Sequence, residues 1–266
     1  MKAKKSLGQN FLKNEDILTS IADVASITSQ DTIIEIGPGT GLLTQVLADR
    51  AKKVIAFELD QDLIPYLLKK FPLSSNVSVY HKDILSLKHD EKLIHEVFSG
   101  TYKVVANIPY YITAPIIQFL LELPVQATSI TLMVQKEVAE RITASVGDMS
   151  ILAISVQYYA TPKYIKTVSR EFFDPIPQVD SAILQLTPKK AFSTQDSRFF
   201  SLVKSGFSSR RKTLINNISS QQGIAKNDLA EIFTALSLPL DIRAQALSLE
   251  LWEQLLEEIT LYKKKS

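Results

Sequence analysis

The sequence predicts an α/β fold in which a mostly parallel, Rossmann-like sheet is followed by a small all-helical domain. Three observations support this prediction. Short runs rich in β-branched residues alternate with amphipathic helical stretches over the first two thirds of the 266 residues. A cluster of glycines directly follows the first of those runs. After Pro188, the chain shows only helical patterns.

Five short runs are predicted to form the parallel strands, because most are apolar enough to be buried on both faces. These are residues 32–36, 54–58, 77–80, 102–106 and 130–135. Apolar side chains at intervals of three and four residues predict helices packed on the sheet at residues 42–51, 62–71 and 115–123. Two further strands are expected at residues 151–168 and 182–186, so that the sheet ends with an antiparallel pair.

The part of the chain after residue 188 is predicted to be helical. Its apolar periodicity places helices at residues 198–207, 210–218, 227–236 and 248–261. We therefore expect a larger domain at residues 1–188 and a helical domain at residues 189–266.

The composition excludes several classes of protein. Without cysteine, the chain has no disulfides and no thiolate metal site. His81, His89 and His95 lack the spacing of a metal-binding pair, so we expect no metal. No apolar run is long enough to span a membrane, and the basic start lacks the apolar core of a secretory signal. We expect a cytoplasmic protein without a membrane partner.

A glycine cluster follows the strand predicted at residues 32–36. Gly37, Gly39 and Gly41 occupy alternate positions in a chain that has only eight glycines. Glycines let the backbone turn tightly and approach a ligand, and the free N–H groups of a helix beginning near Leu42 favour a negative group. We interpret this segment as a cofactor loop. Leu42 stands where a dinucleotide fingerprint requires glycine or alanine, so the loop is not of the dehydrogenase type.

Carboxylates end the next two predicted strands. Glu58 stands where it can accept hydrogen bonds from both hydroxyls of a ribose, which NAD and S-adenosylmethionine share. Asp83 can accept a hydrogen bond from an adenine amino group, or it can cap the following helix.

The most specific motif follows the strand at residues 102–106. Asn107, Ile108, Pro109 and Tyr110 are delivered to the same edge of the sheet as the glycine loop. Pro109 ends strand pairing, so a structural turn is one interpretation. A turn does not require asparagine before the proline or an aromatic residue after it, which favours a functional role.

Together these motifs resemble the ribosomal RNA adenine N6-dimethyltransferase family. The resemblance rests on EIGPGTG, NIPY and LGQNFL, and it extends over nearly the whole chain through QKEVAER, FFDPIPQVDSA and FSSRRKTLINN. One departure is Ile176, where relatives often have a second proline. The family implies a class I methyltransferase sheet and S-adenosyl-L-methionine as cofactor. The match is nearest to the branch that dimethylates two adjacent adenosines near the 3′ end of small-subunit (16S) rRNA, which implies a role in ribosome biogenesis.

The resemblance also implies roles for individual residues. The family's cofactor contacts carry over to Asn10, Leu12, Gly37, Glu58, Asp83 and Asn107, while Gly39 and Gly41 are candidates through the glycine loop itself. The Asn107 side-chain oxygen and the Ile108 carbonyl are expected to accept hydrogen bonds from the target amine and to make its nitrogen more nucleophilic. Tyr110 and Phe173 are expected to stack on the flipped base, next to Pro109.

Basic residues are the candidates for holding the RNA. Net charge is only +2, but Arg210, Arg211 and Lys212 are consecutive and are expected to lie on one face of a helix. Arg141 is a further candidate, unless it pairs with Glu137. The alternative for each is an ordinary solvated surface. The expected partner is small-subunit rRNA within an assembling subunit, bound by a monomer.

Three other functions remain open at this point. A relative that dimethylates large-subunit (23S) rRNA and confers antibiotic resistance shares the cofactor loop and NIPY. A noncatalytic nucleic-acid-binding assembly factor is a second alternative, which the intact Glu58, Asp83 and Asn107 disfavour. A nicotinamide-dependent oxidoreductase is the third, and Leu42 disfavours it.

Overall fold

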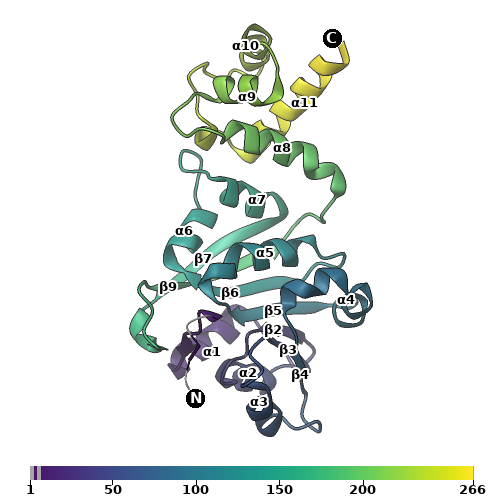
Figure 1. The fold of residues 1–266 in the computed structure, drawn as a ribbon, viewed down its shortest axis with the longest axis vertical. Coiled ribbons are helices and arrows are strands. Elements are labelled where there is room, and N and C mark those ends of the chain that lie inside the picture. Colours follow the sequence, from purple (N-terminus) through teal and green to yellow (C-terminus); the bar gives the residue numbers. More distant parts are fainter. Residues whose placement is uncertain (1–2, 5–6, 266) are drawn as a thin grey trace. The chain divides into compact units, whose positions relative to one another are not determined.

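The central sheet of the computed structural model has seven strands within the described residues, which are 3–4 and 7–265 (Figure 1). Their order across the sheet is β4 (Val77–His81), β3 (Lys53–Glu58), β2 (Thr32–Ile36), β5 (Tyr102–Asn107), β6 (Ser129–Gln135), β9 (Ser181–Pro188) and β7 (Ala160–Val168). The pairs from β4 to β6 are parallel, whereas β9 is antiparallel to both β6 and β7. The predicted Rossmann-like sheet with an antiparallel end is confirmed.

The strand order reverses next to β2. From β2 the chain moves outward through β3 to β4, and then returns to form β5 on the other side of β2. In register, Ile34 on β2 lies opposite Ile55 on β3 and Val104 on β5. A crevice opens beyond the carboxyl ends of parallel strands at such a reversal, so this edge is where a ligand is expected to bind.

Helices cover both faces of the sheet, which explains why the parallel strands are nearly continuous apolar runs. On one face, α1 (Glu15–Val24), α2 (Leu42–Ala48) and α3 (Ile64–Lys70) build a buried cluster with strand residues such as Ile33 and Val105 (Figure 1). On the other face, α4 (Glu91–Phe98) and α5 (Thr113–Glu122) pack through aromatic rings. There the Phe98 ring meets the ring of Tyr102 edge-on at 5.3 Å and that of Phe119 at 6.4 Å.

The chain divides into two compact units. The first is Met1–Glu140 with Tyr159–Ala191, and the second is Arg141–Tyr158 with Phe192–Ser266. The contacts place the segment 141–158 in the second unit together with residues 192–266. The single boundary predicted at residue 188 stays a prediction. The helix α6 (Lys136–Ile142) ends near the start of that segment, and the helix α7 (Ile151–Tyr159) ends near its last residue.

The second unit has its own core of packed helices, namely α8 (Ser197–Gly206), α9 (Leu214–Gln222), α10 (Lys226–Ala235) and α11 (Leu249–Lys265). Trp252 on α11 is fully buried and stacks on Phe207 with ring centroids 6.0 Å apart. Gly206 makes this packing possible, because a Cβ atom there would lie 2.4 Å from the Trp252 ring.

One predicted strand is wrong. Residues 151–159 form α7, and only the continuation from Ala160 to Val168 is a strand, β7. The apolar, β-branched composition of ILAISVQYY suggested a strand, but Ser150 begins a helix there. Its hydroxyl accepts a hydrogen bond from the Ala153 N–H at 3.1 Å, which is the pattern of an N-cap. This local cap outweighs the β propensity of the segment.

The predicted helix at residues 210–218 begins later than expected. Arg210, Arg211 and Lys212 lie in a turn, and α9 begins only at Leu214. The buried Asn217 side chain holds this turn, because its amide donates to the carbonyls of Gly206 at 2.6 Å and Ser209 at 2.9 Å. The three basic residues are exposed in that turn rather than along a helix face.

Candidate functional site

The glycine loop after β2 adopts a backbone conformation that L side chains rarely allow. Gly37, Gly39 and Gly41 have φ of +69°, +59° and +68°. The Gly37 N–H donates to the Phe57 carbonyl at 2.9 Å, and the loop ends where α2 begins at Leu42. A Cβ atom at Gly37 would have the Asn107 carbonyl oxygen as its nearest neighbour, at the ordinary van der Waals distance of 3.9 Å, so the rest of the chain does not crowd the backbone there.

Glu58 forms the floor of the site at the end of β3. Its side chain is only 5% exposed, and its two oxygens accept hydrogen bonds from the backbone N–H groups of Gly39 at 3.0 Å and Asp60 at 2.8 Å. Burial raises the pKa of Glu58 above its ordinary value, while these backbone donors act in the opposite direction. Each carboxylate oxygen retains a further lone pair for a ligand hydroxyl.

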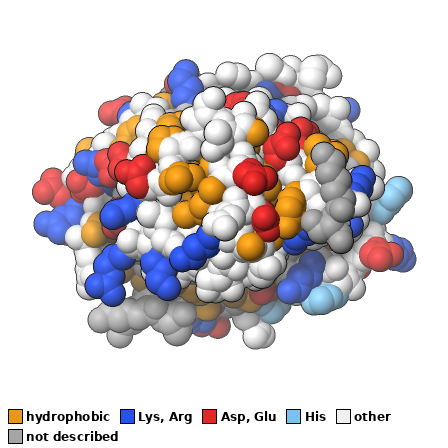
Figure 2. All heavy atoms as spheres, turned by 90° about the horizontal axis from the view of Figure 1, so that it is seen from above, with side chains coloured by type: hydrophobic (Ala, Val, Ile, Leu, Met, Phe, Trp, Pro, Cys, Tyr) orange, Lys and Arg blue, Asp and Glu red, His pale blue; other side chains and the backbone are white. Residues whose placement is uncertain are grey.

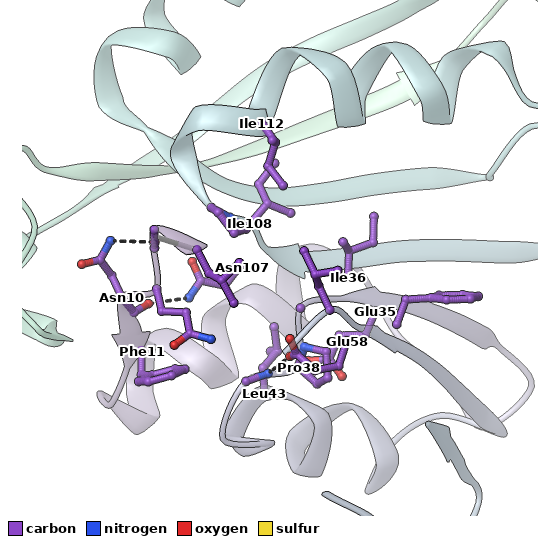
Figure 3. Close-up of a pocket in the computed structure, with 18 of the residues that line it drawn as sticks. Asn10, Phe11, Glu35, Ile36, Pro38, Leu43, Glu58, Asn107, Ile108 and Ile112 are labelled. Atoms are coloured by element: carbon purple, nitrogen blue, oxygen red, sulfur yellow. Dashed lines mark hydrogen bonds between the residues drawn. The ribbon is translucent and has the colours of Figure 1, made fainter. Parts of the chain in front are cut away.

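Asn107 ends β5 beside the glycine loop. Its side-chain amide nitrogen donates to the Asn10 carbonyl at 3.3 Å (Figure 3). Because that partner is an acceptor, the hydrogen bond orients the amide group and leaves its oxygen free to accept from a ligand. Further along the motif, the hydroxyls of Tyr110 and Ser181 lie 2.6 Å apart, which fixes the Tyr110 ring.

Asp83 and the N-terminal segment complete the surroundings. Asp83 caps the 3-10 helix Ile84–His89, because one carboxylate oxygen accepts from the Leu85 N–H at 2.9 Å. The cap is therefore present, and it occupies only one of the two carboxylate oxygens. A second, two-stranded sheet pairs β1 (Phe11–Leu12) with β8 (Phe173–Asp174), with Leu12 opposite Phe173. This pairing was not predicted from the sequence.

These segments line one pocket at the carboxyl edge of the sheet (Figure 3). In Figure 3, Asn10 and Phe11 stand on one side, Glu58 and Pro38 on another, and Asn107 between them. Ten predicted cofactor or catalytic residues line it: Asn10, Leu12, Gly37, Gly39, Glu58, Asp83, Asn107, Ile108, Pro109 and Tyr110. The structure therefore brings together the glycine loop and the NIPY motif.

Gly41 and Phe173 are not among the described residues that line this pocket. Gly41 faces away from it, since a Cβ atom there would lie 2.8 Å from the Phe71 ring and 3.1 Å from Leu67. Phe173 is 3% exposed and belongs to the core that includes Leu12 and Leu18. Cofactor contact by Gly41 and base stacking by Phe173 stay predictions.

One buried acid in the pocket wall was not predicted from the sequence. Glu35, next to the end of β2, is 1% exposed, and within the described residues neither of its oxygens has a hydrogen-bond partner. Burial raises its pKa to about 8, although the nearby Thr44 hydroxyl and Lys70 cation act in the opposite direction. Nothing in the sequence of β2 indicated this, because burial of Glu35 depends on the helices that cover the sheet.

The predicted RNA-binding residues all lie in the second unit. Arg141 is exposed on α6, and Arg210, Arg211 and Lys212 are exposed in the turn before α9. On the face shown in Figure 2, Lys and Arg side chains lie among acidic and apolar ones rather than in one continuous basic patch. Their contact with RNA stays a prediction.

Residues 3–4 and 7–265 contain neither a metal-binding cluster nor a membrane-spanning helix. No group of three or more His, Cys, Asp and Glu side chains in this part of the chain is arranged to hold a metal ion. In the same residues, no helix is both long and apolar enough to cross a membrane.

Comparison with protein families gives one match over almost the whole chain. The family model described as "Ribosomal RNA adenine dimethylase" matches residues 1–261. The chain is 44% identical over 257 residues to "Ribosomal RNA small subunit methyltransferase A" of Alkaliphilus oremlandii, covering 94% of this chain and 89% of that protein. The protein of the same name from Bacillus mycoides is 43% identical over 274 residues, covering 98% of this chain and 92% of that one.

Solved structures show the same relationship. A dimethyladenosine transferase from Plasmodium falciparum has a TM-score of 0.79 and 31% identity, covering 94% of this chain and 98% of that structure. The 23S rRNA methyltransferase ErmE has a TM-score of 0.72 and 25% identity, covering 94% of this chain and 100% of that structure.

Proposed function

This chain belongs to the ribosomal RNA adenine dimethylase family, and from that premise we propose that it transfers methyl groups from S-adenosylmethionine to the N6 nitrogens of two adjacent adenosines in small-subunit rRNA. The observation that carries the proposal is the shared pocket. The glycine loop and Glu58, which suit a ribose-containing cofactor, line the same pocket as Asn107 and Ile108, which suit an amine substrate. A dimethylated product is N6,N6-dimethyladenosine.

The choice of the small subunit is supported by the degree of likeness. Relatives named for the small ribosomal subunit are 40–44% identical to this chain over 94–98% of its length, whereas a 23S rRNA methyltransferase is 25% identical over a similar share. The large-subunit enzyme is the second candidate. An oxidoreductase has no support, and a purely noncatalytic role is disfavoured by the intact Glu58, Asp83 and Asn107.

The pocket fits S-adenosylmethionine on two counts. The buried Glu58 carboxylate has lone pairs left for two ribose hydroxyls. The lack of a side chain at Gly37, where an added Cβ atom would have its nearest neighbour 3.9 Å away, lets a ligand approach the backbone closely. We expect Glu58 to hold the ribose, Asp83 to accept from the adenine amino group, and Asn10 and Leu12 to border the rest of the molecule. When bound, this cofactor supplies an electrophilic methyl group.

The chain's own contribution to the reaction centres on Asn107. The adenine amine is a poor nucleophile because its lone pair is delocalised into the ring. The free side-chain oxygen of Asn107 and the carbonyl of Ile108 accept hydrogen bonds from that amine and favour a tetrahedral nitrogen. The hydrogen bond from Asn107 to the Asn10 carbonyl holds the acceptor in place, so that catalysis relies on positioning. The released proton passes to solvent.

Aromatic side chains are proposed to hold the target base. Tyr110 lines the pocket, and its hydroxyl contact with Ser181 keeps the ring in a fixed orientation. Stacking on such a ring contributes about 1–3 kcal/mol per base. For Phe173 the same role requires its ring to leave the core when RNA binds, because it is buried in this structure.

Contact with the rest of the RNA is assigned to basic residues. The four candidates are all exposed, namely Arg141, Arg210, Arg211 and Lys212. No acidic residue adjoins positions 210–212 in the sequence, which suits binding to phosphates. We expect the substrate to be rRNA within an assembling small subunit. We expect the enzyme to be monomeric and cytoplasmic.

The test is incubation of the purified chain with labelled S-adenosylmethionine and ribosomal subunits that lack these methyl groups. Label recovered as N6,N6-dimethyladenosine in small-subunit rRNA supports the proposal. Label in large-subunit rRNA alone would replace it with the second candidate, and absence of label from both subunits would contradict methyl transfer.

A further inference from the structure

The N-terminal segment that forms one wall of the pocket is fastened to the loop after β3. Residues 7–12 all line the pocket. From this segment, the Gln9 side-chain amide donates to one carboxylate oxygen of Asp60 at 2.7 Å. The ammonium of Lys4, which precedes the segment, contacts the other carboxylate oxygen at 2.5 Å. Lys4 and Gln9 are also joined to each other, because the Lys4 N–H donates to the Gln9 side-chain oxygen at 2.7 Å.

Asp60 is built to hold these donors. Its side chain is 3% exposed and also accepts the Asp62 N–H at 3.0 Å. Burial alone would raise the pKa of Asp60, but the hydrogen bonds from Lys4 and Gln9 outweigh burial and lower it, so the carboxylate is charged at neutral pH. A charged carboxylate that is buried needs such partners, so losing them is costly.

Asp60 also connects the segment to the cofactor-binding carboxylate. Its backbone N–H donates to Glu58 at 2.8 Å, while its side chain binds Gln9 and Lys4. At its far end the segment is held by two other contacts, the hydrogen bond from Asn107 to the Asn10 carbonyl and the pairing of Leu12 with Phe173. The Asp60 contacts are therefore the attachment on the Glu58 side of the pocket.

We propose that Asp60 is a positioning residue. Its contacts with Lys4 and Gln9, here called the clasp, hold residues 7–12 against the pocket and thereby retain bound S-adenosylmethionine. The proposal rests on the proposed function, since it takes that molecule as the ligand. Asp60 touches the segment and not the reacting atoms, so its loss acts on cofactor release rather than on the chemical step.

The main experiment compares Asp60→Asn with Asp62→Asn by calorimetry and stopped-flow binding of S-adenosylmethionine. Asp60→Asn keeps the shape and the backbone contact to Glu58, and we expect the Kd to rise about tenfold through faster dissociation, as for the loss of a hydrogen bond to a charged group. Asp62 contacts the same Lys4 ammonium at 2.7 Å, but its side chain is 74% exposed. Its variant is expected to change Kd less than about twofold, because exposed ion pairs contribute little.

A second variant changes the other partner of the hydrogen bond between Gln9 and Asp60. Gln9→Met removes the donor to Asp60 while keeping the length of the side chain, and we expect it to raise Kd several-fold. The effects of Gln9→Met and Asp60→Asn should be less than additive in the double variant, because both break one contact. Amide hydrogen exchange in residues 7–12 should accelerate in both variants, whereas exchange in β3 should not.

The outcomes separate the two proposals. If the unaltered chain binds S-adenosylmethionine and both variants bind it equally tightly, the clasp is refuted while the proposed function stands. Fully additive effects, or unchanged exchange in residues 7–12, would also refute the clasp, because Asp60 would then act only through Glu58. If the unaltered chain does not bind S-adenosylmethionine at all, the proposed function fails, and the clasp fails with it.

Discussion

Gly41 is expected to be the most sensitive position of the glycine loop to substitution by alanine. Its φ of +68° lies in the left-handed region, where a Cβ atom costs about 1–2 kcal/mol. The added atom would also lie 2.8 Å from the Phe71 ring and 3.1 Å from Leu67. Both side chains are buried, so they have little room to move, and such overpacking costs about 1–3 kcal/mol. The backbone strain and the overpacking together should lower the free energy of unfolding of the first unit by about 2–5 kcal/mol.

The assay for Gly41→Ala has to report on the first unit. The single tryptophan, Trp252, lies in the second unit, so its fluorescence does not report on unfolding of the first unit. Hydrogen exchange of the β2 and β3 amides in increasing denaturant measures the stability of the sheet directly. The control is Gly100→Ala, because a Cβ atom at Gly100 meets nothing within 4 Å. A loss below about 1 kcal/mol at Gly41, or an equal loss at Gly100, would refute the reasoning.

Two further predictions concern the core of the second unit and the buried acid. Gly206→Ala should lower the stability of the second unit by about 1–3 kcal/mol, because its Cβ atom would collide with Trp252; unchanged Trp252 fluorescence melts would contradict this. Glu35 has its pKa raised to about 8, so the folded state holds a proton that the unfolded state has lost above its ordinary pKa of 4.5. Stability should therefore fall as pH rises from about 5 to 8, by up to about 1.4 kcal/mol per pH unit, and Glu35→Gln should flatten that decline. Parallel pH profiles of the two proteins would count against a neutral Glu35.

The sequence allowed prediction of features whose cause is local. The strand at residues 32–36 was predicted with its exact bounds, because a buried parallel strand is a continuous apolar run. Glu58 and Asn107 were assigned to one edge of the sheet because each ends a strand of that sheet. Chain direction and strand order then bring them to the same pocket.

Features that depend on distant partners were missed. The pairing of Leu12 with Phe173 joins residues far apart in sequence, and the two-residue strands carry no periodicity. Burial of Glu35 and the contacts of Asp60 arise only when helices and the N-terminal segment pack on the sheet. The helix at residues 151–159 shows the opposite failure. A local N-cap signal, Ser150, was present in the sequence, but the prediction followed the β-branched composition instead.

The claim that the glycine loop and the NIPY motif form one catalytic pocket is tested most directly by measuring methyl transfer in the Asn107→Ala variant. The measurement is turnover on undermethylated small subunits at saturating S-adenosylmethionine, with circular dichroism as a check of the fold. If Asn107 positions the target amine, turnover should fall by at least about a hundredfold while the fold is retained, because an interaction made only in the transition state is lost. Turnover equal to that of the unaltered chain would contradict the account.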